Sequence, residues 1–173
     1  MLKVIYGSEY GHAKQYAETF ARSFKVPANS YKNIGHLDSE DTIIYFGALY
    51  AGGVLGLSSI ENKFKKLAIV TVGLADPNIT KNAESIRRSI QKSTDSDILQ
   101  KAQIFHVRGG IDYSKLRLRH KIMMKLLYTK VKNIPESEQD DETITMIKTY
   151  GKEVNFVDLS SLEPIIKFVK GLP

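Results

Sequence analysis

The chain has 173 residues, 42% of them hydrophobic and 25% charged, with a formal net charge of +6 at pH 7. These values are ordinary for a globular protein of one domain, and we expect a cytoplasmic protein. The absence of cysteine excludes disulfides, thiolate metal sites and cysteine nucleophiles. Its four histidines have no ligand-like spacing, so no metal site is expected, and no apolar run is long enough to span a membrane.

The positive charge is concentrated in one segment of the chain. Residues 101–132 contain nine lysines and arginines but only one acidic residue, Asp112. The basic character therefore needs a local explanation rather than one for the whole surface.

The first stretch combines an apolar strand, a glycine loop and a helix. Residues 2–6 form a short apolar run, residues 7–12 a loop of small and polar residues, and residues 13–21 an amphipathic helical pattern. A loop that leads from a strand into a helix presents free N–H groups and the positive end of the helix dipole, which suits a phosphate. The alternative is a plain strand-to-helix turn without a ligand.

Further strands and helices alternate along the chain. Strands are expected at residues 26–34 (an edge strand), 42–48, 67–73 and 103–110. A helix is expected at 80–92, and Ser58 or Ser59 is expected to cap a short helix through Phe64. Residues 94–97 are expected to form a polar break. Alternation of this kind predicts right-handed βαβ units and a parallel sheet.

Each strong strand runs into glycine-containing sequence. The glycines concerned are Gly7, Gly11, Gly52, Gly53, Gly73, Gly109 and Gly110. In a doubly wound sheet these loops share the carboxyl edge, where ligands bind, and small residues allow a flat ligand to approach the backbone. The alternative is that the glycines only end the strands.

Residues 115–132 are predicted to form one helix with a basic stripe and a wide apolar arc. The stripe consists of Arg117, Lys121, Lys125 and Lys132, and the arc of Leu116, Leu118, Ile122, Met123, Met124, Leu126, Leu127 and Val131. This arc exceeds what a helix buried on one side needs, which favours a second contact with an anionic membrane surface, an apolar substrate or a partner subunit. A solvated basic face on a core helix is the alternative. With Tyr128 as its only aromatic residue, the helix is not expected to bind nucleic acid.

The last part of the chain is predicted to form an acidic loop, a strand and a helix. Residues 135–142 are acidic and are expected to lead into a helix that ends near Tyr150, before a short strand at 153–157. Asp158 or Ser160 is expected to cap the final helix.

Nearly the whole chain resembles a known superfamily, although the resemblance is uneven and is carried by a few segments. The segment Ser8-Glu9-Tyr10-Gly11-His12-Ala13 resembles the flavodoxin phosphate loop, with Tyr10 and Ala13 in place of hydroxyl residues and Glu9 as an added negative charge. Residues 109–127 and 152–158 are similar to the flavodoxin-like, menaquinone-dependent protoporphyrinogen dehydrogenases.

The resemblance implies an α/β fold with a doubly wound, five-stranded parallel sheet in strand order 2-1-3-4-5. It also implies a single flavodoxin-like FMN-binding domain over residues 1–173, with a basic helical insertion at about 110–152 before the last helix. The FMN phosphate is expected on the amides of residues 8–13. The implied cofactor-binding residues are Ser8, Glu9, Tyr10, Gly11, His12, Ala13, Leu49, Tyr50, Ala51, Gly52, Gly53, Val72, Gly73 and Leu74. The ring is expected between the loops around Tyr50 and Gly73, with Tyr50 stacked on it.

The implied function is that of an FMN-dependent oxidoreductase acting on a porphyrinogen or quinone-type substrate close to a membrane. Residues 115–132 would contact anionic lipid there, and a homodimer is a further possibility. Two alternatives stay open. One is a flavodoxin-type electron carrier with a protein redox partner, and the other is a lipid- or protein-binding module without cofactor. The sequence assigns no catalytic residue.

Overall fold

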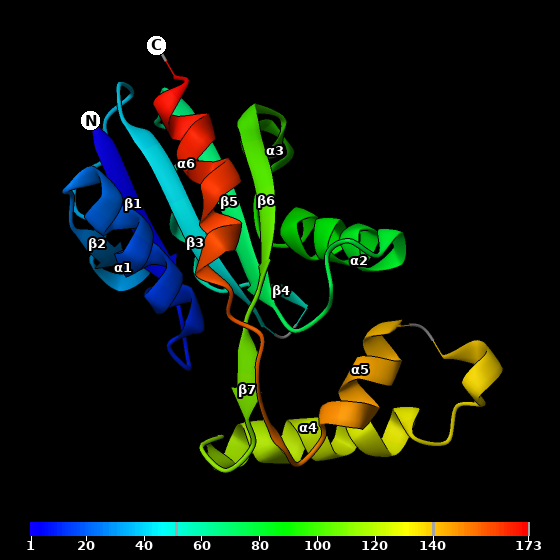
Figure 1. Ribbon diagram of the computed structural model, residues 1–173. Helices are drawn as coiled ribbons and strands as arrows, with labels where there is room; N and C mark the ends of the chain where they lie inside the picture. Colours follow the sequence, from blue (N-terminus) through cyan, green and yellow to red (C-terminus); the bar gives the residue numbers. More distant parts are fainter. Residues whose placement is uncertain (51, 140, 173) are drawn as a thin grey trace.

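The computed structural model describes residues 1–50, 52–139 and 141–172. Its centre is a parallel sheet in the order β2-β1-β3-β5-β6 (Figure 1). These strands are β1 (Leu2–Gly7), β2 (Ala28–Ser30), β3 (Thr42–Tyr50), β5 (Lys66–Gly73) and β6 (Ala102–Arg108). Counted along the chain, this is the order 2-1-3-4-5, so the predicted α/β fold is confirmed.

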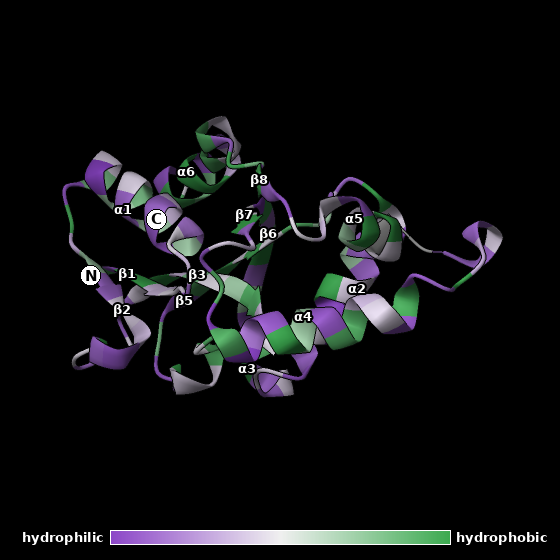
Figure 2. Ribbon diagram, turned by 90° about the horizontal axis from the view of Figure 1, so that it is seen from below, coloured by the Kyte–Doolittle hydropathy of each residue, from purple (hydrophilic) through white to green (hydrophobic). Residues whose placement is uncertain are grey.

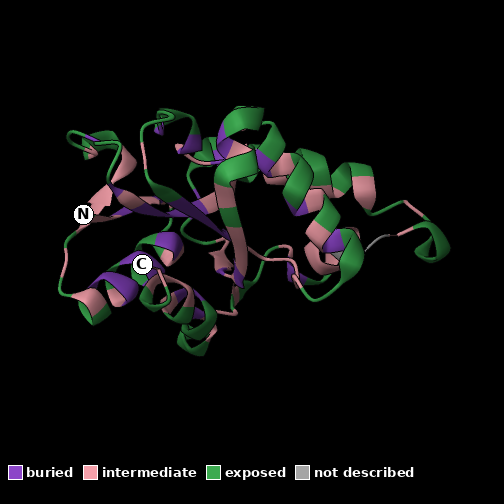
Figure 3. Ribbon diagram, turned by 90° about the horizontal axis from the view of Figure 1, so that it is seen from above, coloured by how far each residue is buried: buried purple, intermediate pink, exposed green. Residues whose placement is uncertain are grey.

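Helices cover both faces of the sheet, as the continuous apolar strands require. On one face lie α1 (His12–Phe24) and α6 (Glu163–Lys170), and on the other α2 (Thr80–Gln91) and α3 (Ser96–Lys101) (Figure 1). Consecutive residues of β3 alternate between the two cores. Ile44 and Phe46 belong to the core under α1 and α6, whereas Ile43 and Tyr45 belong to the core under α2 and α3. The central strands are accordingly buried (Figure 3).

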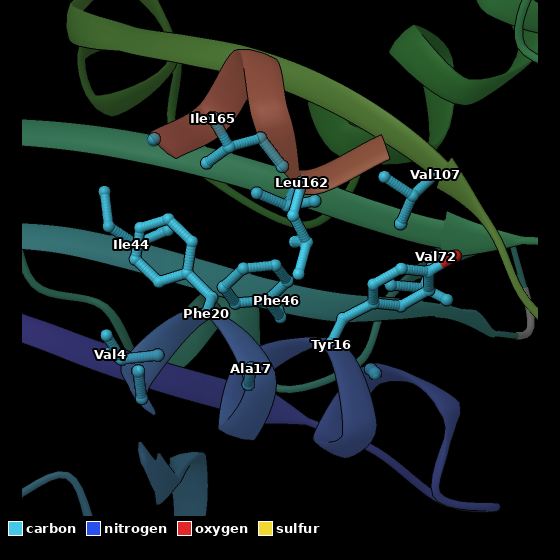
Figure 4. Packing of buried hydrophobic residues seen from close by; sticks show 14 residues of the cluster. Val4, Tyr16, Ala17, Phe20, Ile44, Phe46, Val72, Val107, Leu162 and Ile165 are labelled. Atoms are coloured by element: carbon cyan, nitrogen blue, oxygen red, sulfur yellow. The ribbon is translucent and has the colours of Figure 1, made fainter. Parts of the chain in front are cut away.

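The core under α1 and α6 fixes the first helix against the sheet. Tyr16, Ala17 and Phe20 on α1 are completely buried in this core, with Phe20 beside Phe46 of β3 and the Tyr16 ring towards Val72 of β5 (Figure 4). The rings of Phe20 and Phe46 lie 5.5 Å apart between centroids. This packing holds the start of α1, and with it the loop that follows β1, in a fixed place at the carboxyl edge of the sheet.

Residues between β6 and α6 form a substructure beyond that edge. It consists of β7 (Gly110–Asp112), α4 (Leu118–Val131), a 3-10 helix (Glu136–Glu138), α5 (Asp141–Thr149) and β8 (Glu153–Asn155). The strands β7 and β8 pair in antiparallel fashion, and α4 lies across the carboxyl ends of the sheet strands (Figure 1). Tyr128 of α4 stacks on Tyr150 at 4.0 Å, and the Tyr113 ring meets Tyr150 edge-on.

Three expectations from the sequence were wrong in detail. The helix predicted to reach Phe64 is only a 3-10 turn at Leu57–Ser59, because the backbone becomes extended at Ile60, whose side chain is buried in the core. The polar break at 94–97 contains the start of α3, which buries Ile98. The basic helix begins at Leu118 instead of residue 115, since the carboxylate of Asp112 accepts the N–H of Ser114 and holds a turn there.

Two short strands were not predicted, β4 and the strand β7 described above. The strand β4 (Gly53–Val54) pairs in antiparallel fashion with the end of β3. It folds the glycine-rich loop after β3 back on itself, so that Leu49 faces Val54.

Candidate flavin site at the carboxyl edge of the sheet

A cavity of about 870 Å³ lies between the carboxyl edge of the sheet and helix α4. The loops after β1, β3, β5 and β6 all reach it, and they contribute Ser8, Gly52, Gly73 and Gly109 to its wall. The predicted convergence of the glycine-containing strand ends is therefore observed. A cavity of this size lies within the range of pockets that bind cofactors and drug-sized ligands.

The loop after β1 has the backbone geometry of an anion site. Gly11 has φ 99°, in the left-handed region, and immediately precedes α1. Among the described residues no side chain caps α1, and the first turn of this helix carries no acidic residue. The hydroxyl oxygen of Ser8 accepts the N–H of Gly11 at 3.1 Å and so shapes the loop. The helix end therefore keeps positive potential and exposed N–H groups towards the loop.

Glu9 places a carboxylate in the same loop, but cations of the insertion face it. Its Oε1 lies 3.1 Å from the guanidinium of Arg117 and 3.6 Å from that of Arg119. The Glu9 side chain is largely buried, whereas both arginines are mostly exposed. One negative and two positive charges leave the loop with a net positive charge, which favours an anion there.

The loop after β5 forms the opposite wall and is held by Arg108. The guanidinium of Arg108 donates two hydrogen bonds to the carbonyl oxygen of Leu74, at 3.2 and 3.0 Å, and lies 3.9 Å from the ring centre of Phe156. The side chain at the end of β6 thus fixes the turn at Gly73 and Leu74, which forms one side of the slot.

The buried residue of α4 is a histidine, His120, which is 3% exposed. Its Nδ1 is hydrogen-bonded to the hydroxyl of Tyr10 and its Nε2 to the hydroxyl of Tyr50, the latter at 2.5 Å. Both tyrosine rings also meet the imidazole edge-on. His120 therefore connects α4 to the loops after β1 and β3.

The remaining walls come from three helices and are mostly apolar. Asn82 and Ile86 of α2, Leu127 of α4 and Met146 of α5 line the cavity. Its lining also includes Met123 and Met124, so that every methionine of the chain except Met1 lies at this cavity. Methionine side chains are flexible and polarisable and adapt to apolar ligands.

Two histidines differ in their relation to the cavity. His12 lines it and is partly buried, which lowers its pKa below the usual value, so its imidazole is neutral at pH 7. His106 on β6 is bonded through Nδ1 to the hydroxyl of Thr71 at 2.6 Å and is not among the lining residues. Burial, and to a lesser degree Arg87, lowers the pKa of His106 as well.

Most of the predicted cofactor residues border this cavity. The lining includes Ser8, Glu9, Tyr10, His12, Ala13, Leu49, Tyr50, Gly52, Gly53, Val72, Gly73 and Leu74. Gly11 belongs to the same loop without lining the cavity, and Ala51 lies outside the described residues. Sequence patterns missed His120, Asn82 and Met146. Of these three residues, only His120 could have been recognised in the sequence as a candidate site residue, because it falls within the apolar arc of a basic helix.

The outer side of α4 is apolar as well as basic. Leu118 is 74% exposed and Leu126 is 68% exposed, and Lys121 and Lys125 are exposed on the same helix. Seen from below, α4 shows hydrophobic and hydrophilic residues side by side (Figure 2). The predicted excess of apolar residues is thus a surface that α4 leaves open. No helix within the described ranges is long and apolar enough to cross a membrane.

Comparison with known proteins gives the family. A family model described as a flavodoxin domain matches residues 3–138, which is more than half of the chain. The chain therefore belongs to the flavodoxin domain family. Comparisons with curated proteins and with solved structures gave no match. In the part of the chain that the structure describes, no group of three or more histidine, cysteine, aspartate or glutamate side chains could hold a metal ion.

Proposed function

We propose that this protein is an FMN-dependent oxidoreductase and that the cavity under α4 holds the flavin. The observation that carries the proposal is the meeting of four strand-end loops at the uncapped start of α1, in a chain of the flavodoxin domain family. Domains of this family generally bind FMN. The phosphate would lie on the backbone of residues 8–13, and the ring between the loops at Tyr50 and Gly73.

The residues present fit FMN, although two features depart from the usual phosphate loop. Ala13 supplies no hydroxyl group, so backbone N–H groups would hold the phosphate largely on their own. Glu9 would repel a phosphate dianion, but Arg117 and Arg119 offset its charge. These arginines belong to the insertion, so the insertion would contribute to phosphate binding.

The bound flavin would supply the two-electron redox chemistry, and the chain would position it and shield it. Helix α4 covers the slot and limits the access of water. Arg108 fixes the wall at Leu74, and Tyr50, which lines the cavity, would contact the ring. His12, neutral and beside Gly110, is available as a hydrogen-bond donor or acceptor at the phosphate end.

We infer a bulky apolar substrate of the porphyrinogen or quinone type. The cavity extends beyond the flavin loops to α2 and α5, where Ile86, Met123 and Met146 provide an adaptable apolar wall. At its rim, Arg119 and Lys130 would attract an acidic substituent. The similarity of residues 109–127 to protoporphyrinogen dehydrogenases agrees with this class of substrate.

The same helix supports a proposed contact with an anionic membrane surface. Leu118 and Leu126 are exposed, and Lys121 and Lys125 lie nearby on the same helix. This combination suits a helix at a lipid interface, where apolar side chains insert and lysines meet phosphate groups. Residues 1–173 would then act as a single domain, with the insertion at 110–152 providing both the cover of the cavity and the lipid contact.

A one-electron carrier of the flavodoxin type is the second candidate, and the shared family favours it. A carrier docks its flavin edge on a protein partner and needs no large apolar cavity beside it. A cofactor-free module that binds lipid or protein through the basic helix is the third. Turnover with a small-molecule acceptor in the absence of any protein would distinguish the enzyme from the carrier.

Titration of FMN with the purified protein tests the proposal. Quenching of flavin fluorescence is expected with a dissociation constant in the micromolar range or lower, and riboflavin, which lacks the phosphate, should bind at least tenfold more weakly. No binding of FMN at a protein concentration of about 100 μM would leave only the cofactor-free module.

A further inference from the structure

We propose that Tyr10, His120 and Tyr50 form a proton relay that leads from solvent into the cavity. The inference rests on the proposed function, because it assigns to these residues the delivery of protons that a redox reaction in the cavity consumes. The chain of contacts is continuous, from the Tyr10 hydroxyl to Nδ1 of His120 and from Nε2 of His120 to the Tyr50 hydroxyl.

The two ends of this series of hydrogen bonds differ in their surroundings. Tyr10 is 38% exposed, in the loop after β1, and forms the outer end. His120 is buried, and Tyr50 lies at the end of β3, where the flavin ring is expected. All three side chains line the cavity, so protons have a path along its wall from the exposed ring of Tyr10 to Tyr50.

The relay needs one particular direction of the hydrogen bonds, and a backbone contact is compatible with it. The N–H of Arg117 donates to the Tyr10 oxygen at 3.3 Å, so the Tyr10 hydroxyl proton is free to point at Nδ1 of His120. A neutral imidazole carries one N–H, which the relay assigns to Nε2 as donor to the Tyr50 oxygen, with Nδ1 accepting from Tyr10. The Tyr50 proton is left to point away from His120, into the cavity.

The transfer of one proton along the relay takes place as follows. Tyr50 gives its O–H proton to an acceptor in the cavity and takes the Nε2 proton of His120. Nδ1 of His120 takes the Tyr10 proton, and Tyr10 takes one from water. Each broken O–H or N–H bond is replaced by a new one, His120 changes its tautomer, and one proton moves to the acceptor from a water molecule, whose hydroxide is neutralised by the buffer. The acceptor is a quinone-type compound that gains two electrons, which the substrate loses on its oxidation, and two protons. His120 returns to its first tautomer between the two proton transfers.

A purely structural role would be that His120 pins α4 to two loops. The variant His120→Gln separates the two roles, because a glutamine amide can still donate to one hydroxyl and accept from the other. It cannot exchange protons between two basic nitrogens. The exposed His36, which lies in the loop before β3, offers the matched control His36→Gln.

The first measurement needs no cofactor. ¹⁵N NMR of the histidine-labelled protein should show His120 as a neutral imidazole with the proton on Nε2, and Tyr10→Phe should remove that preference. A doubly protonated His120, or a proton on Nδ1, would overturn the direction of transfer and with it the relay. This result is independent of whether FMN binds.

The second measurement uses the FMN-loaded protein, reduced anaerobically with dithionite and mixed with a soluble naphthoquinone. His120→Gln should slow reoxidation at least tenfold, while the FMN dissociation constant changes less than threefold, and His36→Gln should match the wild type. An unchanged rate in His120→Gln, or a loss fully explained by weaker FMN binding, would overturn the relay. Failure of the wild type to bind FMN would refute the proposed function instead.

Discussion

The hydroxyl group of Tyr16 lies 2.7 Å from the carbonyl oxygen of Arg108 and donates a hydrogen bond to it. The same hydroxyl accepts the N–H of Asp158 at 2.9 Å. Arg108 is the last residue of β6 and Asp158 follows β8, so one buried side chain on α1 joins the two chain segments that enter and leave the insertion. The position of α4 over the cavity depends on this junction.

Replacing Tyr16 by phenylalanine should lower the free energy of unfolding by about 1 kcal/mol, because it removes two hydrogen bonds and leaves the partly buried carbonyl of Arg108 and N–H of Asp158 without this partner. Hydrogen exchange should also become faster at residues 110–112 and 153–155. Tyr45→Phe is the matched control, since Tyr45 is also buried and donates to the carbonyl oxygen of Leu55, far from the junction. Equal acceleration of exchange in both variants would contradict a special role for Tyr16.

The left-handed conformation of Gly11 is expected to matter for the anion site. Gly11→Ala should strain the loop by about 1–3 kcal/mol and weaken FMN binding about tenfold or more. Gly151 has a similar positive φ of 76° and open space around it, but it lies beyond α5. Gly151→Ala should therefore cost similar stability and leave the FMN dissociation constant unchanged. A similar loss of affinity in both variants would show that strain acts only through overall stability.

Removal of the carboxylate in the phosphate loop should strengthen phosphate binding. Glu9→Gln eliminates one negative charge and frees Arg117 and Arg119 for the ligand, so the affinity for FMN should rise several-fold. The affinity for riboflavin, which has no phosphate, should not rise. Calorimetric titration with both ligands checks this. If the affinity for riboflavin rose as much as the affinity for FMN, the effect of Glu9→Gln would not act through the phosphate.

Stability should fall as the pH decreases from 7.5 to 5.5. Burial lowers the pKa values of His12 and His106, so the unfolded chain binds more protons than the folded one once the pH approaches 6.5. The pKa values of Asp41 and Asp158 are lowered too, so these carboxylates stay ionised over this range. Melting temperatures should drop in the wild type and less in His12→Gln. An equal drop of the melting temperature in His12→Gln would show that His12 does not contribute to the pH dependence of stability.

Charge reversal on α4 should abolish binding to anionic vesicles. Sedimentation with vesicles of phosphatidylglycerol and phosphatidylcholine should pull down the wild type, and Lys121→Glu/Lys125→Glu should stay in solution. Lys65 and Lys66 are exposed at the opposite edge of the sheet, where β5 begins. Lys65→Glu/Lys66→Glu changes the net charge equally and should sediment like the wild type. An equal loss of vesicle binding in both double variants would show that binding depends only on the net charge of the protein.

The fold could be predicted because its strands carry a strong pattern. The buried run at Ile43–Phe46 and the similar run in β5 need helices on both faces, and glycines mark their carboxyl ends. The loops of the candidate site followed from that topology alone. The short elements could not be predicted from the sequence, because β4 depends on pairing with β3 and the turn at Leu57 depends on the burial of Ile60.

The cluster around His120 could not be predicted because it joins residues 110 and 70 positions apart. A basic helix with a wide apolar arc indicates a second contact, but only the structure places its histidine between Tyr10 and Tyr50. The same holds for Glu9, which in the sequence is an unfavourable charge beside a phosphate. In the structure, Arg117 and Arg119 compensate it.

The location of bound flavin is the most direct test of FMN binding at the carboxyl edge. ¹H–¹⁵N correlation spectra of the labelled protein, recorded during a titration with FMN, should show the largest shifts at residues 8–13, 49–53 and 72–74. Shifts confined to the basic outer side of α4, or no shifts at millimolar FMN, would contradict a flavin site in this cavity.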